Sequence, residues 1–151
     1  MTIADWPHFD DDQIDAATRV LASGRVNTWT GKETKDFERE FASWCVSSHA
    51  IAMANGSLAL SAAYLSVGLG RGDELITTPR TFIATASSAV LLGAKPVFAD
   101  VDPDSGSITA ATIAPLITAR TKSIAVVHVG GWPADMPSIC DLARDHGIPI
   151  I

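Results

Sequence analysis

The amino-acid sequence predicts an α/β fold in which a mostly parallel sheet is covered by helices on both faces. Short apolar runs alternate with amphipathic stretches along most of the chain, which is typical of repeated β-α units. The run at 123–129 (SIAVVHV) is apolar on both faces, as a strand buried inside a parallel sheet must be. Hydrophobic residues make up 47% of the 151 residues and charged residues 19%, which excludes a disordered or fibrous chain.

Two amphipathic helices are expected in a helical N-terminal segment, residues 1–48. The first lies between an acidic cap at Asp10 and a C-terminal stop at Gly24. The second begins near Thr34, and its aromatic positions share one face at the spacing i, i+4, i+7. These aromatic positions are Phe37, Phe41 and Trp44.

Residues 49–151 form the alternating β/α region of this prediction. Strands are expected at 49–54, 74–78, 96–101, 123–129 and 148–151. Helices are expected between them at 58–67, 82–92, 112–118 and 137–145. Pro115 shortens the third of these helices or delays its first turn. The sequence stops inside an apolar strand, so we expect a large domain that is incomplete at its C-terminus.

Charge and cysteine content narrow the possible functions. Eleven basic and seventeen acidic side chains give a net charge of −6, which argues against nucleic acid or an anionic membrane as partner. Cys45 and Cys140 lie far apart in the sequence, so we expect neither a disulfide scaffold nor a metal site. The acidic N-terminus has no signal-peptide pattern, and the stretch 81–94 is too short and polar to span a bilayer. We therefore expect a cytoplasmic protein.

The turn Asn55-Gly56-Ser57-Leu58 lies between a predicted strand and a predicted helix, where open α/β sheets bind ligands. Gly56 lets a ligand approach the backbone, and the Ser57 hydroxyl and first helix amides can bond phosphate oxygens. The helix dipole favours an anion at this place. The alternative is a plain β-to-α turn with Ser57 as its cap. Neither a Walker loop nor a G-x-G-x-x-G fingerprint is present.

Three further segments carry candidate ligand contacts. Phe82, in the segment PRTF, could stack on a flat heterocycle or cap the core. His128, at the end of the most buried strand, could face a ligand or serve as a hydrogen-bonded structural residue. Trp29, in the polar loop 27–31, could contact substrate or pack against a neighbouring subunit.

The order and spacing of these segments resemble the opening half of the DegT/StrS-type aminotransferases. The matching motifs are NGSLAL at 55–60, GDELI at 72–76, PRTFIAT at 79–85, GAKPVFADVD at 93–102, TKSI at 121–124 and HVGGWPADM at 128–136. The resemblance runs from about Gly31 to Ile151, and the loop before it is similar but looser. Members of this family are pyridoxal phosphate (PLP) enzymes of the fold type I architecture. They mostly aminate nucleotide-linked keto-sugars, with glutamate as the usual amino donor.

The resemblance also implies roles for individual residues. Gly56, Ser57 and the amide of Leu58 match the positions that bind the cofactor phosphate, and Leu58 stands where members often have alanine. Phe82 matches the aromatic residue that stacks on the pyridine ring. The segment Trp29, Thr30 and Gly31 resembles the part of the family near the sugar substrate. The resemblance assigns no role to His128.

Two catalytic groups of the family are expected beyond Ile151. One is the aspartate that pairs with the pyridine nitrogen, and the other is the lysine that forms the Schiff base. The chain has lysines at four positions, none of which matches the motif of that lysine: Lys32, Lys35, Lys95 and Lys122. By itself the chain is expected to be inactive, with no catalytic residue of its own, and to supply part of a binding pocket in a homodimer with shared active sites.

Two other functions remain compatible with the sequence. One is a PLP-dependent sugar dehydratase of the same fold, in which histidine replaces the lysine. The other is a non-catalytic truncated module that binds cofactor or sugar. The segment that would distinguish the first from an aminotransferase is expected beyond Ile151.

Overall fold

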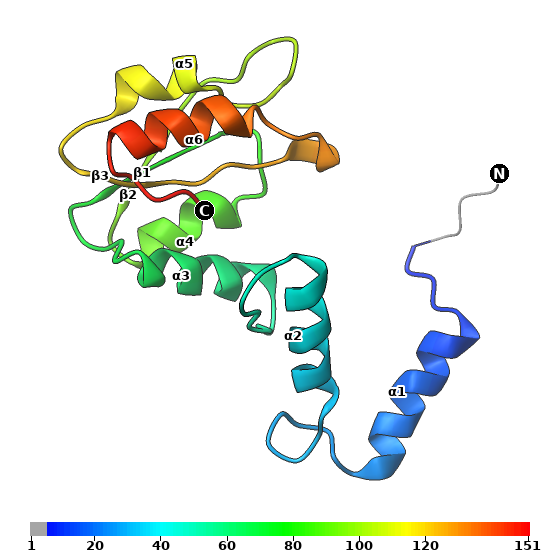
Figure 1. Cartoon of the computed structure of the whole chain (residues 1–151). Helices are drawn as coiled ribbons and strands as arrows, with labels where there is room; N and C mark the ends of the chain where they lie inside the picture. The colour runs from blue at the N-terminus through cyan, green and yellow to red at the C-terminus, as the bar shows by residue number, and fades with distance from the viewer. Residues whose placement is uncertain (1–5) are drawn as a thin grey trace. The chain divides into compact units, whose positions relative to one another are not determined.

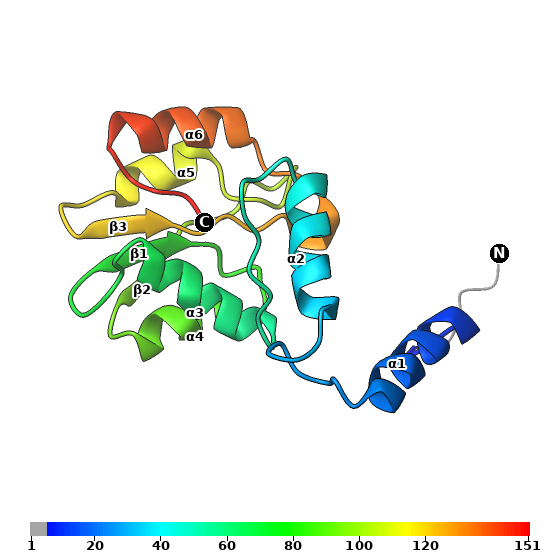
Figure 2. The same ribbon diagram turned by 60° about the horizontal axis from the view of Figure 1, so that its bottom comes forward.

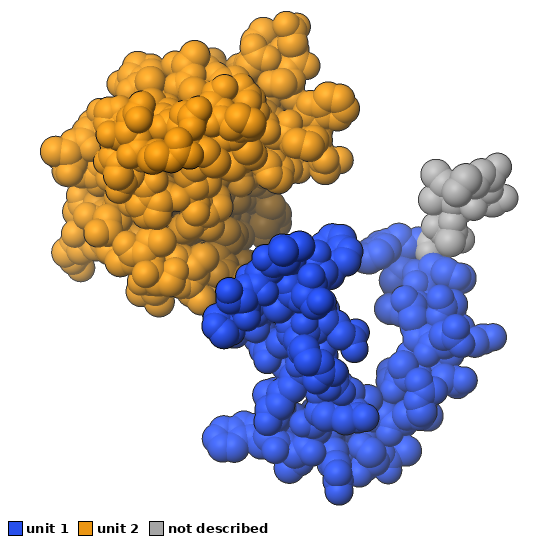
Figure 3. Space-filling model, in the orientation of Figure 1, with its two compact units in different colours: residues 1–52 blue, residues 53–151 orange. Residues whose placement is uncertain are grey.

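The computed structural model describes residues 6–151, which divide into two compact units, Met1–Ala52 and Met53–Ile151 (Figure 3). Residues 1–5 of the expected helical segment lie outside the described residues.

The second unit is built around a parallel sheet of three strands in the order β2-β1-β3 (Figure 1). The strands are β1 (Glu74–Thr77), β2 (Lys95–Phe98) and β3 (Thr121–Ile124). Beside β3, Ile150 forms an isolated parallel bridge with Ile124, and the Ile151 N–H donates to the Ile124 carbonyl over 2.9 Å. The end of the chain therefore extends the sheet beyond β3.

Helices cover both faces of this sheet (Figure 2). One face carries α3 (Gly56–Ser66) and α4 (Ala84–Leu91), and the other carries α5 (Ala110–Ile113) and α6 (Met136–Asp145). In β1, Leu75 packs in a core cluster with Tyr64 of α3, whereas Ile76 packs in a second cluster with Ile139 of α6. Successive residues of a strand face opposite sides, so both core clusters depend on β1. The predicted α/β class is confirmed.

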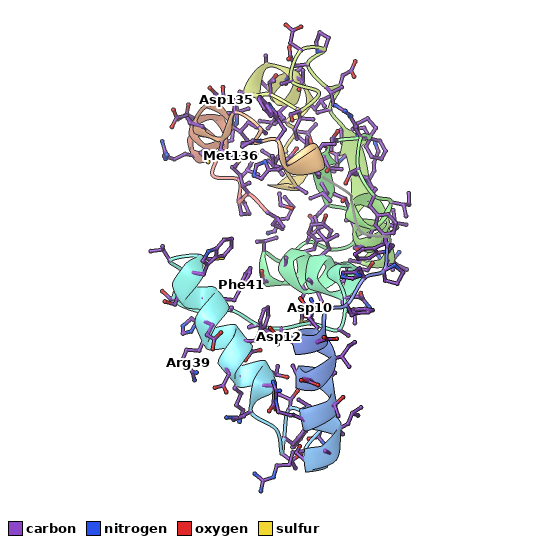
Figure 4. The ribbon with its side chains drawn as sticks, turned by 90° about the vertical axis from the view of Figure 1, so that its right-hand side faces the viewer. Asp10, Asp12, Arg39, Phe41, Asp135 and Met136 are labelled. Carbon is purple, nitrogen blue, oxygen red and sulfur yellow. The ribbon has the colours of Figure 1, made fainter. Side chains whose placement is uncertain are left out.

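The helix ends follow from local capping. Asp135 caps α6, which begins at Met136 (Figure 4), and the Asp135 carboxylate accepts a hydrogen bond from the Ser138 N–H. Thr109 caps α5 in a reciprocal box with Thr112, so this helix begins before the predicted 112. Pro115 lies in the short 3₁₀ turn Ala114–Leu116 that follows.

The strand expected at 49–54, where the first unit ends and the second begins, is wrong. Residues 49–54 form no strand, and Ile51 is 80% exposed, because no described segment pairs with this stretch. Instead, the Ala52 N–H donates to the Glu38 carboxylate over 2.8 Å. In α3 of the second unit, Leu58 and Leu65 are about half exposed. The helix presents only part of its apolar surface to α4 and the sheet.

The first unit contains α1 (Asp11–Ser23) and α2 (Glu33–Trp44), as predicted. Asp10 caps α1, and the helix ends at Gly24 with φ 67°. Figure 4 shows Asp10 and Asp12 at the start of α1, where carboxylates favour the helix dipole. On α2 the ring centroids of Phe37 and Phe41 lie 5.5 Å apart. In α1 no residue is buried, and in α2 only Ala42 is.

Within residues 6–151, no helix combines the length and the apolar character needed to cross a membrane.

A buried carboxylate begins β1. The Glu74 side chain is 4% exposed and accepts hydrogen bonds from the Thr118 hydroxyl over 2.6 Å and from the Arg120 guanidinium over 2.8 Å. The Lys95 ammonium lies 3.9 Å away. The hydrogen bonds from Thr118 and Arg120 lower the pKa of Glu74. The carboxylate thus joins the starts of all three strands.

We expect Glu74 to make the stability of the second unit depend on pH. Because its pKa is lowered in the folded state, ionised Glu74 stabilises the fold at neutral pH. This contribution is lost as the pH falls from about 5 through the folded-state pKa. Glu74→Gln should therefore lower the midpoint temperature of thermal unfolding at pH 7, as measured by circular dichroism. As the pH is lowered, this midpoint should decrease less in Glu74→Gln than in the wild type. The exposed control Glu40→Gln should follow the wild type. Equal acid sensitivity in Glu74→Gln and wild type would contradict this assignment.

Candidate functional site

Three loops gather at the carboxyl edge of the sheet. They follow β1 (78–83), β2 (99–109) and β3 (125–128). Because all three strands are parallel, the loops after them leave the same edge. Helix α4 begins from the first of these loops, and its second turn is hydrogen bonded to the start of α3. Of the candidate residues from the sequence, Phe82 lies in the loop after β1 and His128 in the loop after β3.

The start of α3 has open hydrogen-bond donors. The Asn55 side-chain oxygen accepts a bond from the Leu58 N–H over 3.0 Å, which caps the helix. Among the described residues, neither the N–H groups of Gly56 and Ser57 nor the Ser57 hydroxyl donates a hydrogen bond. A Cβ built on Gly56 would have no atom within 4 Å, so a ligand can approach this backbone freely. The arrangement suits an anion such as a phosphate.

This cap changes the donors expected from the sequence. The Leu58 amide was expected to bind the phosphate, but its N–H is already bonded to Asn55. The N–H groups that remain open are those of Gly56 and Ser57, the two residues before Leu58. Asn55 was not singled out from the sequence as a residue of the site. An asparagine directly before a glycine and a helical pattern is an N-cap signal that could have found it.

Two hydrogen bonds attach α3 to α4, one at each end of α3. The buried Ser88 hydroxyl donates to the Ser57 carbonyl over 3.3 Å. The Tyr64 hydroxyl donates to the Thr85 carbonyl over 2.8 Å, and burial raises the pKa of Tyr64 to about 12. Tyr64 therefore stays protonated and remains a donor at any physiological pH. The first contact fixes the Ser57 backbone against α4, and the second fixes the last turn of α3.

Phe82 lies two residues before α4 and is 74% exposed. Its carbonyl accepts the Thr85 N–H over 3.1 Å, so its backbone belongs to the first turn that leads into the helix. The ring does not cap the core formed by the described residues, which was the alternative. An exposed aromatic ring of this kind is available to stack on a flat ligand.

His128 has a structural role within the described residues. Its Nδ1 atom accepts a hydrogen bond from the Ala134 N–H over 3.2 Å. Between them, Gly130 and Gly131 have φ values of 64° and 82°, which only glycine adopts readily. The histidine thus closes the glycine loop that leads from β3 to α6.

In the first unit, the loop 27–31 is held by one asparagine. The Asn27 side-chain oxygen accepts bonds from the N–H groups of Trp29 and Thr30 and from the Thr30 hydroxyl. The loop leaves Trp29 94% exposed. A cavity of about 250 Å³ lies beside it. Its lining residues are Ser23, Arg25, Thr30, Gly31, Lys32 and Glu33. The basic residues of this cavity, Arg25 and Lys32, were not predicted as ligand contacts, because isolated charged residues form no recognisable binding motif in a sequence.

Comparison with known proteins decides the family. Residues 7–151 match the family model of the DegT/DnrJ/EryC1/StrS aminotransferases. The chain belongs to this family. The resemblance found in the sequence is thereby confirmed.

Solved structures of aminotransferases are similar to the chain over nearly its whole length. The aminotransferase from Psychrobacter cryohalolentis is 50% identical with a TM-score of 0.95, and the match covers 99% of this chain and 38% of that one. Helicobacter pylori PseC, an aminotransferase involved in the biosynthesis of pseudoaminic acid, is 29% identical with a TM-score of 0.88, covering 95% and 38%. Bacillus subtilis NtdA, with bound cofactor PMP, is 27% identical with a TM-score of 0.88, covering 94% and 33%.

The chain thus spans 33–38% of the length of these proteins. It has the fold of the large domain of PLP-dependent aminotransferases, with a parallel sheet between layers of helices. The family is one of aminotransferases. Family members depend on PLP, and NtdA holds the related cofactor PMP.

Proposed function

We propose that the protein carrying this chain is a PLP-dependent aminotransferase that aminates a nucleotide-linked keto-sugar, with glutamate as amino donor. The chain supplies the phosphate-binding turn at the start of α3 and the ring-stacking residue before α4. The observation that carries the proposal is the set of open donors of Gly56 and Ser57, attached to the helix that follows Phe82. Family membership supports the cofactor.

The residues present fit the phosphate of the cofactor. Two N–H groups and one hydroxyl at a helix start offer three donors to a dianion, and the helix dipole adds a favourable field. The Ser88 hydroxyl holds this turn to α4, and the Tyr64 hydroxyl holds the other end of α3 to the same helix. The Leu58 side chain is about half exposed and borders the turn, so it limits the space beside the phosphate.

Phe82 would orient the cofactor ring. Its backbone is held by the first turn of α4, while its exposed ring offers a flat apolar surface. When bound, PLP acts as an electron sink that lets nitrogen move between an amino acid and a carbonyl group.

The lysines of the second unit are unsuited to this site. Lys95 is the first residue of β2 and lies 3.9 Å from Glu74, at the starts of the strands. Lys122 lies in the first half of β3, next to Gly68. Both are at the edge of the sheet opposite the loops that follow the strands. Lys32 and Lys35 of the first unit do not match the family's lysine motif either. We therefore propose that the Schiff-base lysine comes from outside residues 6–151.

We expect Ser57→Ala to weaken cofactor binding. Loss of one hydrogen bond to a charged phosphate should raise the Kd about tenfold to a hundredfold. The measurement is a fluorescence titration of the full-length protein with pyridoxamine phosphate, a probe that binds without a lysine bond. The control Ser66→Ala, at the other end of α3, should bind as the wild type does. A wild-type protein that is folded yet does not bind this probe would refute the proposed function.

The substrate is proposed to be anionic because of the cavity beside loop 27–31. Arg25 and Lys32 line this cavity in a chain whose net charge is −6, and Thr30 adds a hydroxyl. Two basic groups suit the diphosphate of a nucleotide-linked sugar. Gly31 has no room for a side chain, because a Cβ there would meet the Arg25 carbonyl oxygen at 2.6 Å. The exposed Trp29 would contact the sugar or base of the same substrate.

Replacing the basic residues of this cavity should weaken nucleotide binding. We expect Arg25→Gln and Lys32→Gln each to raise the Kd for UDP or dTDP about tenfold, since each removes a charged donor. Calorimetric titration measures this effect. Lys35→Gln, an exposed change on α2 outside the cavity, serves as the control. Unchanged affinity in both cavity variants, with pyridoxamine phosphate binding intact, would exclude this substrate site while leaving the cofactor site standing.

We also propose a homodimer with shared active sites. Apolar side chains on the helices of the first unit are exposed in the isolated chain, among them Leu21 at 71% and Trp44 at 79%. Apolar helix faces of this kind are normally covered by other protein. In the full-length protein, sedimentation should give twice the monomer mass, and Trp44→Asp should shift the protein towards monomer. Lys35→Asp, which also introduces an aspartate on α2, is the control. A monomeric wild type would refute the dimer.

A further inference from the structure

Arg80 connects two loops at the carboxyl edge of the sheet. It lies in the loop between β1 and α4, two residues before Phe82. Its Nη1 atom donates to the Gly106 carbonyl over 3.1 Å, across 26 residues of sequence. Gly106 belongs to the loop between β2 and α5. One side chain therefore joins the loop that carries the ring-stacking residue to the loop of the neighbouring strand.

The acceptor side of this contact is a well-ordered turn. The Asp102 carboxylate accepts bonds from the N–H groups of Asp104 and Ser105 and from the Ser105 hydroxyl. The backbone closes the turn through Gly106 N–H to Asp102 oxygen at 2.8 Å and Asp102 N–H to Ser107 oxygen at 2.9 Å. The hydrogen bond from the Ser105 N–H is the main cause of the lowered pKa of Asp102. The carboxylate thus remains ionised at neutral pH, and the Gly106 carbonyl has a fixed direction.

Gly106 is also required by the position of the guanidinium. Its φ of 66° lies in the left-handed region that favours glycine. A Cβ at this position would collide with Arg80 Nη1. The guanidinium therefore lies directly against the Gly106 backbone, and Gly106 is buried. The hydrogen bond and the close approach of the guanidinium to the Gly106 backbone are two separate observations of the contact between Arg80 and Gly106.

The loop that carries Phe82 has few other attachments to a second strand. The Arg80 N–H donates to the Thr78 hydroxyl over 3.0 Å, and the hydroxyls of Thr81 and Thr85 lie 3.0 Å apart. Both contacts are local to the loop and its own helix. The Phe82 ring is 74% exposed, so core packing among the described residues does not hold it. Its place is set by the backbone of the loop.

We propose that Arg80 is a positioning residue, which holds the loop of Phe82 to the turn 102–107 and so places the aromatic ring against the cofactor. This inference rests on the proposed function, because Phe82 is the group that Arg80 positions. A purely structural Arg80 would affect stability and leave the bound cofactor unchanged.

The test compares Arg80→Met and Arg80→Lys with wild type in the full-length protein. We expect Arg80→Met to raise the Kd for pyridoxamine phosphate about fivefold to tenfold, the loss of roughly one hydrogen bond. At saturation its induced circular dichroism should be weaker, since the ring no longer orients the cofactor. Hydrogen exchange of residues 79–86 should be faster even without cofactor. Arg80→Lys, which retains one donor, should restore part of each effect. Arg144→Met, which removes an exposed arginine on α6, is the control.

Gly106→Ala provides a second variant that leaves Arg80 in place. Its methyl group would displace the guanidinium, so it should reproduce the exchange and binding changes of Arg80→Met. In the double variant the two binding effects should not add, because both break one contact. Wild-type affinity and induced dichroism in both single variants would overturn the role of Arg80 alone. Failure of the wild type to bind pyridoxamine phosphate would instead overturn the proposed function, and this inference with it.

Discussion

The burial of β1 on both faces is the constraint on which the rest of the second unit depends. All four residues of this strand are buried, and its two central side chains belong to different core clusters. The strand can bury both faces only if helices lie on each side and a strand pairs along each edge. Parallel pairing then brings the loops after the strands to one edge. The buried Glu74 at the other edge joins the strand starts.

The candidate site differs from this core because it has N–H groups without hydrogen-bond acceptors and an exposed aromatic ring. The first amides of α3 are open, and the Phe82 ring is largely exposed, although the backbone beneath both is held by hydrogen bonds. Open donors on a fixed backbone are a typical arrangement for binding, because little conformational entropy is lost when the ligand arrives. The loop around Asn27 repeats this arrangement, with an ordered backbone that leaves Trp29 exposed.

Much of the second unit could be predicted from the sequence. Apolar periodicity placed β1, β2 and α6 close to their observed positions, because burial on one or two faces produces a regular pattern of apolar residues. The strand expected at 123–129 overlaps β3 only at residues 123–124, and the chain leaves the sheet ladder earlier than the apolar run suggests. The segment 49–54 has the same apolar pattern and forms no strand. A strand also needs a neighbouring strand to pair with, and the local sequence does not specify that neighbour. Family resemblance supplied the candidate residues Ser57 and Phe82. The Asn55 cap, however, was missed; it occupies the Leu58 N–H and leaves the N–H groups of Gly56 and Ser57 open.

By itself the sequence determined the fold class, the order of the elements and the family, because each depends on local residue patterns or on motifs in a fixed order. Only the tertiary structure decided which distant residues touch. Arg80 reaches Gly106 and Tyr64 reaches Thr85 across 26 and 21 positions. No local pattern specifies such pairs, because they arise when packed strands and helices bring separate loops within hydrogen-bond distance.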